Sequence, residues 1–116
     1  INEISFEENL IAVDWFLFSQ FLLKKATAIF TSDSKTFYRQ HSENTVGLGN
    51  QDYNAIMLSI RVKKIHYEIM EKIDKKYKLL LTEIIKLEKK ISNRIFPLKN
   101  KIVPNLLWWE NTALVK

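Results

Sequence analysis

Residues 52–96 read DYNAIMLSIRVKKIHYEIMEKIDKKYKLLLTEIIKLEKKISNRIF, a stretch that contains no glycine and no proline. Pro97 follows it directly, and Asp52 or Asn50 is a suitable N-cap at its start. Because glycine and proline are the strongest helix breakers, the stretch predicts one long helix or a pair of helices over residues 52–96.

Apolar side chains cover a broad arc on the first half of this stretch, and charged residues fill the remaining strip. One edge of the arc holds Ile56, Ile60 and Tyr67, and the other holds Leu58, Val62, Ile65, Ile69 and Ile73. A helix with so broad an arc is expected to pack against two neighbours.

The second half has apolar residues spaced alternately three and four apart, which is a heptad pattern. Its members are Met70, Ile73, Tyr77, Leu80, Ile84, Leu87 and Ile91. Leu81 and Ile85 widen the stripe, which favours a bundle over a two-stranded coil. Parallel pairing would place Glu83 against Glu88, so an antiparallel arrangement is favoured.

The length of the stretch leaves two alternatives. A single helix over 52–96 would be about 67 Å long, whereas a compact domain of this size is about 35 Å across. The helix either breaks near Asp74-Lys75-Lys76 or projects and is covered by a second subunit. Since the heptad phase continues through these three residues, we slightly favour a long helix and a homodimer.

A first helix is predicted upstream, over residues 5–30. Ser5-Phe6-Glu7-Glu8 has the pattern of a capping box, and only Asp14, Ser19 and Gln20 are polar between Leu10 and Leu23. A helix that is apolar nearly all round is buried on several sides.

The other segments complete a single all-α domain over residues 1–116. Residues 31–50 are polar, hold both glycines and predict a long loop. Pro104 precedes a short apolar run, which predicts a short C-terminal helix over 104–113. The expected fold is an antiparallel helical bundle of three to four helices.

Composition excludes several classes of protein. The 116 residues include no cysteine, which excludes a disulfide scaffold, a thiol nucleophile and cysteine-based metal sites. With two histidines and no paired ligand spacing, neither a metal nor a cofactor is expected. The apolar stretch from Leu10 to Leu23 is too short to span a membrane and contains Asp14, so we expect a cytoplasmic protein.

Charge is distributed unevenly along the chain. Residues 1–58 have seven acidic and four basic side chains, a net of −3, and residues 59–116 have six and fourteen, a net of +8. Such asymmetry permits nucleic-acid binding, and equally the packing of one half against the other or against a partner of opposite charge. However, the lysine runs alternate with acidic residues, as on a solvated helix face, and arginine is scarce. The excess of lysine, isoleucine and asparagine is typical of AT-rich phage and accessory bacterial genes.

Arg61 and His66 are spaced as Arg-x4-His. This hexapeptide resembles the catalytic signature of HEPN-type ribonucleases, although Val62 stands where those enzymes usually have a polar residue. The resemblance implies an all-α, often dimeric ribonuclease without a metal. Histidine would move the proton and arginine would stabilise the charge on the phosphate.

A structural role for His66 is the competing interpretation. His66 falls within the apolar arc, about 140° around the helix from Arg61. Asp14 lies among apolar residues of the first helix, and a buried carboxylate needs a partner. We therefore predict a buried polar pair between Asp14 and His66.

Partner-binding residues are predicted in the loop and the tail. Phe37, Tyr38, Arg39 and His41 are residue types that are frequent at interface hot spots, and they lie in the long loop. Trp109 is a further candidate, because adjacent Trp108 and Trp109 cannot both face one core.

No glycine-rich loop, nucleophile elbow, paired-carboxylate motif or metal cluster occurs in the sequence, so no catalytic residue is predicted. The first hypothesis is a non-catalytic module that binds another protein stoichiometrically, as immunity proteins and antitoxins do when they inhibit a toxin. The second is a basic nucleic-acid-binding or regulatory protein, and the third is the HEPN-like ribonuclease that uses Arg61 and His66.

Overall fold

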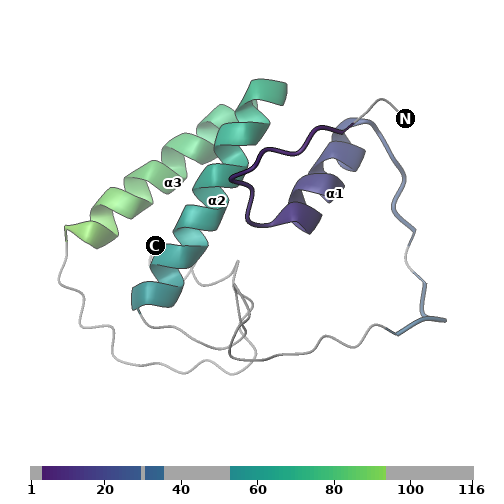
Figure 1. Cartoon of the computed structure of the whole chain (residues 1–116), viewed down its shortest axis with the longest axis horizontal. Helices are drawn as coiled ribbons and strands as arrows, with labels where there is room; N and C mark the ends of the chain where they lie inside the picture. Colours follow the sequence, from purple (N-terminus) through teal and green to yellow (C-terminus); the bar gives the residue numbers. More distant parts are fainter. Residues whose placement is uncertain (1–3, 30, 36–52, 94–116) are drawn as a thin grey trace.

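The computed structural model describes residues 4–29, 31–35 and 53–93, and the regular elements of this part of the chain are all helices. They are α1 (Val13–Leu23), α2 (Tyr53–Ile73) and α3 (Tyr77–Ser92). Figure 1 shows α2 between the other two, with α3 beside it on one side and α1 on the other. The prediction of a helical fold is confirmed for the described residues.

The contact between α2 and α3 is the larger of the two interfaces of α2. Ile56 and Ile60 of α2 pack with Ile84 and Ile91 of α3, and all four side chains are buried. Tyr67 packs against the same cluster, as its position on this edge of the apolar arc predicts. Burial of such side chains contributes about 1.5–3 kcal/mol each, so this cluster is a principal source of stability.

The opposite edge of α2 contacts α1. Phe16 of α1 packs with Ile69 and Met70 of α2, and Ile4 and Ile65 lie at the border of this second cluster. The two clusters occupy the two edges of the arc, which confirms that α2 packs against two neighbours.

The described part of the 52–96 stretch, residues 53–93, contains two helices, so the slight preference for one long helix was wrong. The Asp74 N–H still donates to the Met70 carbonyl (2.8 Å), but the Asp74 carboxylate accepts a hydrogen bond from the Lys76 N–H (2.9 Å). Asp74 thereby ends α2 and provides an acceptor at the start of α3. Each of the two helices is short enough to fit within a compact domain, so helix length does not require a second subunit.

The first helix begins at Val13 and not at Ser5 as predicted, and its N-cap Ala12 provides no side-chain hydrogen bond. Instead, Glu7 forms an ion pair with Lys72 of α2 (3.3 Å), and the Phe6 ring packs edge-on against Phe16 with centroids 5.7 Å apart. Phe6 and Glu7 therefore make tertiary contacts in place of the predicted capping box.

The first helix ends at Leu23, before the predicted Phe30. The Ala26 N–H donates to the Phe21 carbonyl (2.9 Å), and the Lys25 N–H donates to the Leu22 carbonyl (3.0 Å). Lys25 has a φ of 60°, which completes a Schellman motif with lysine where glycine is preferred. No glycine marks this helix end, so the sequence pattern placed it too late.

The remaining predicted segments lie mostly outside the described residues. Residues 31–35 of the predicted loop are described and form no helix. Residues 36–50 and the predicted C-terminal helix over 104–113 fall in segments that the structure does not describe.

Candidate functional site

His66 lies at the centre of an aromatic cluster between α1 and α2, with 1% of its surface exposed. The Trp15 indole is stacked on the imidazole with centroids 3.6 Å apart and an interplanar angle of 6°. Tyr67 of α2 and Tyr77 of α3 contact the ring edge-on, with centroids 5.8 and 6.2 Å away. The cluster therefore joins all three helices around one imidazole.

The polar contact of His66 is with Ser19 of α1. Ser19 Oγ lies 3.3 Å from His66 Nε2, whereas buried His66 Nδ1 has no hydrogen-bond partner. An unpaired buried N–H costs more than an unpaired lone pair on a nitrogen that is not protonated. We therefore assign the proton to Nε2, which donates to Ser19 Oγ.

Burial lowers the pKa of His66 from 6.5 to about 4, because desolvation penalises the charged imidazolium. No carboxylate contributes to this shift in the pKa of His66, in agreement with the aromatic surroundings. Burial also raises the pKa of Tyr67, and the electrostatic interaction with the neighbouring Tyr77 raises this pKa further. At neutral pH the cluster is uncharged.

The predicted Asp14–His66 pair is not formed. Asp14 is exposed in the first turn of α1, where its Oδ1 accepts a hydrogen bond from the Trp15 N–H (2.8 Å). A carboxylate at a helix N-terminus is stabilised by the helix dipole and needs no buried partner. Trp15 and Ser19, one helical turn apart, are the residues that face His66. The sequence does not single out these two residues, because α1 is apolar nearly all round and its pattern does not reveal the inward face.

Arg61 and His66 do not form one site. Arg61 is exposed on α2, whereas His66 is buried and covered by the stacked Trp15 indole. A general base must reach the proton it removes, and a neutral imidazole with 1% exposure cannot approach an RNA phosphate without unpacking α1. This geometry opposes the ribonuclease interpretation.

A groove of about 380 Å³ runs between α2 and α3 on the surface. Its apolar lining comes from Tyr67 of α2 and from Leu80, Ile84 and Leu87 of α3. Ile84 belongs to the buried core, while Leu80 has 45% of its surface exposed. The groove is therefore a continuation of the hydrophobic core to the surface.

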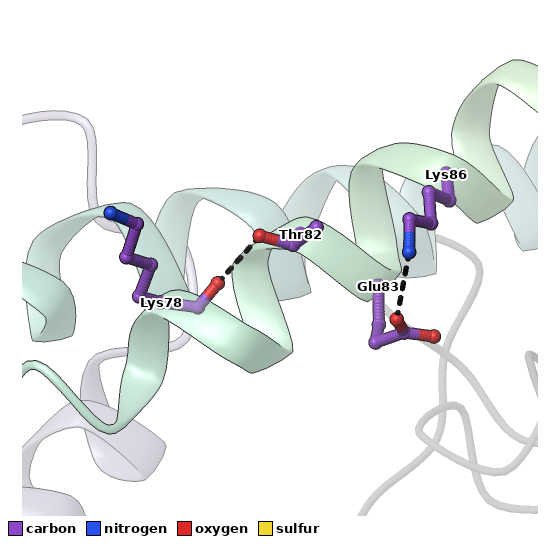
Figure 2. A network of polar contacts seen from close by, with 4 residues as sticks. All are labelled: Lys78, Thr82, Glu83 and Lys86. Atoms are coloured by element: carbon purple, nitrogen blue, oxygen red, sulfur yellow. Dashed lines mark hydrogen bonds and ion pairs between the residues drawn. The ribbon is translucent and has the colours of Figure 1, made fainter.

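The polar lining of this groove is mostly basic. Lys63 of α2 and Lys86 and Lys90 of α3 line it, against the single carboxylate of Glu83. Three positive charges and one negative charge make a net of +2. Figure 2 shows the Glu83–Lys86 ion pair on α3, whose N–O distance is 3.3 Å. Thr82, also drawn there, donates to the Lys78 carbonyl (2.9 Å) and does not line the groove.

The predicted partner-binding residues Phe37, Tyr38, Arg39, His41 and Trp109 lie outside the described residues. Within the described ranges, no group of three His, Asp or Glu side chains could hold a metal ion. None of the helices there is long and apolar enough to cross a membrane. Comparison of the chain with protein-family models, curated sequences and solved structures gives no match.

Proposed function

We propose that this protein is a non-catalytic module that binds another protein stoichiometrically, in the manner of an immunity protein or antitoxin that masks its target. The observation that carries the proposal is the apolar groove between α2 and α3, which is bordered by exposed Leu80 and by lysines. Apolar surface rimmed by charge is typical of protein interaction sites.

Exposed apolar side chains elsewhere on the described helices support the same proposal. Phe18 and Leu22 of α1 have 61% and 66% of their surface exposed, and Leu79 of α3 has 69%. Single exposed apolar residues are common, but Phe18 and Leu22 are one turn apart on one helix face.

Binding of nucleic acid is the second candidate function, favoured by the exposed lysines at the α2–α3 turn, Lys75, Lys76 and Lys78. Against it, Lys64 and Lys72 form ion pairs with Glu88 and Glu7. A phosphate-binding surface would leave its lysines available for phosphate oxygens. The HEPN-like activity is less favoured still, because His66 is buried away from Arg61.

We also propose that the three helices form part of an antiparallel bundle. Lys64 of α2 and Glu88 of α3 lie at similar distances along the chain from the turn at Asp74 and form an ion pair of 2.8 Å. That register supports α3 running back along α2, as short connections between helices favour.

The experiment that tests the proposal is purification of the tagged full chain from its native host, with and without nuclease. Mass spectrometry and light scattering then establish composition and stoichiometry. We expect one partner protein in a fixed molar ratio that survives nuclease treatment. Recovery of nucleic acid alone would favour the second candidate, and a chain recovered alone or only with its own copies would contradict the proposal.

A further inference from the structure

We infer that the groove between α2 and α3 binds an acidic amphipathic helix of the partner protein. This inference rests on the proposed function, because it names the chemistry of the segment that the module binds. It is carried by the shape of the apolar lining and by the charge around it.

The apolar lining has the spacing that a helix requires. Leu80 and Leu87 are at positions i and i+7 of α3, with the buried core residue Ile84 between them at i+4, and Tyr67 borders this stripe from α2. The lining residues Leu80 and Lys90 are about 15 Å apart along α3, which is close to three helical turns. An amphipathic helix with apolar residues at matching intervals would cover this stripe along its whole length.

The charge around the groove selects an acidic segment. Lys63, Lys86 and Lys90 give it a net of +2 after Glu83 is subtracted. The Glu83–Lys86 pair is exposed, with 61% and 69% of the side-chain surfaces accessible, and such pairs are weak. Lys86 can therefore exchange Glu83 for a carboxylate of the partner at little cost.

Other occupants fit the same surface less well. A nucleic acid would use the lysines but would leave the apolar stripe without a matching contact, and the groove is lined by no arginine. A second copy of this chain has a net charge of +5, so the basic rim of the groove would repel the copy as a whole. Residues 1–58 of that copy are acidic and are the part that the rim would not repel. A helix with apolar and acidic faces satisfies both features.

The test uses the full chain and a fluorescent model peptide of about 14 residues, or roughly 20 Å of helix. The peptide has leucines at positions that match the stripe and glutamates elsewhere. A second peptide has lysines in place of the glutamates, and a third is a scrambled form of the first. Fluorescence anisotropy at about 50 mM and about 500 mM NaCl measures binding of each.

Two pairs of variants separate the groove from its surroundings. Leu80→Ser removes an apolar contact in the groove, and Leu79→Ser changes its exposed neighbour outside the lining. Lys86→Gln with Lys90→Gln removes two charges at the rim, and Lys75→Gln with Lys76→Gln removes two at the turn. Circular dichroism verifies that each variant keeps its helices.

We expect only the acidic peptide to bind. Both groove variants should weaken its affinity about tenfold, and both matched controls should change its affinity less than about twofold. The charge effect should shrink at the higher salt concentration. Equal binding of the lysine or scrambled peptide, or equal losses in the matched controls, would overturn the inference. So would displacement of the acidic peptide by polyuridylate at equal concentration.

The same variants, purified from the native host, separate this inference from the proposed function. A stoichiometric partner that both groove variants release, and both matched controls retain, supports the inference when the acidic peptide also binds. A partner that both groove variants retain overturns the inference and leaves the proposed function intact. A wild-type chain that captures no protein overturns the proposed function and, with it, this inference.

Discussion

The indole of Trp15 is stacked on the imidazole of His66, with ring centroids 3.6 Å apart and planes within 6° of parallel. The contact joins α1 to α2 at a point where the imidazole is also held by Ser19 and bordered by Tyr67 and Tyr77. Aromatic pairs contribute about 0.5–1.5 kcal/mol beyond the area they bury. The docking of α1 therefore depends on keeping His66 neutral and desolvated.

The free energy of unfolding should decrease as the pH is lowered from 6.5 to about 4. Because the pKa of His66 is lowered to about 4 in the folded state, only the unfolded chain binds a proton at this site in that window. Each unit of pKa shift corresponds to about 1.4 kcal/mol, so the loss approaches 2–3 kcal/mol at pH 4 as an order of magnitude. Urea unfolding at a series of pH values measures it.

The control for this pH dependence is His66→Phe, which keeps a flat aromatic ring against Trp15 and has no titratable group. Its unfolding free energy should change less between pH 6.5 and 4 than that of the wild type, by about the His66 contribution. An identical pH profile in both proteins would mean that carboxylates account for the whole effect.

Replacement of Ser19 by Ala should destabilise the protein by about 1–2 kcal/mol, because buried His66 Nε2–H then has no acceptor. In the His66→Phe background the same replacement should cost close to nothing, since the donor is absent. A double-mutant cycle by urea unfolding measures the difference. Equal costs in both backgrounds would show that Ser19 acts independently of His66.

Lys25→Gly should stabilise the protein by up to about 1 kcal/mol. Lys25 has a φ of 60° at the position after α1 where the Schellman motif favours glycine, and glycine adopts this conformation without a Cβ clash. Thermal unfolding provides the measurement, with Lys24→Gly as control because Lys24 has a φ of −81°. A gain for Lys24→Gly and none for Lys25→Gly would contradict this account of the helix end.

Asp74→Ala should cost about 1 kcal/mol by removing the acceptor of the Lys76 N–H at the start of α3. Asp74→Asn retains an acceptor oxygen and should cost less than half as much. Chemical unfolding compares the two variants. If both cost the same, charge and not the hydrogen bond would account for the effect of Asp74.

The Lys64–Glu88 ion pair should show a small coupling energy, below about 1 kcal/mol, because both side chains are about one-third exposed. The hydrogen bond that Lys64 donates to the Glu88 carboxylate raises the pKa of Lys64, which agrees with a direct contact. A Lys64→Met and Glu88→Gln double-mutant cycle at low and high salt measures the coupling. A coupling energy well above about 1 kcal/mol that persists at high salt would contradict the view that this pair is weak and screened by solvent.

The sequence alone determined that the fold of the described chain is helical and how α2 is used. Apolar periodicity placed Ile60 and Ile69 on opposite edges of one arc, and each edge packs against a different helix. Periodicity is a local property that the chain expresses before any partner helix is known. The α2–α3 break lies at Asp74-Lys75-Lys76, the position that the sequence offered for it, although the sequence slightly favoured one uninterrupted helix.

Only the tertiary structure decided where α1 begins and ends and what His66 contacts. Phe6 and Glu7 lie outside the helix, where they contact Phe16 and Lys72 instead of forming the predicted capping box. On an all-apolar helix such as α1, no pattern shows which side faces inward. The pairing of Ser19 with His66, and the groove beside Leu80, therefore follow from packing between helices, which one sequence cannot reveal.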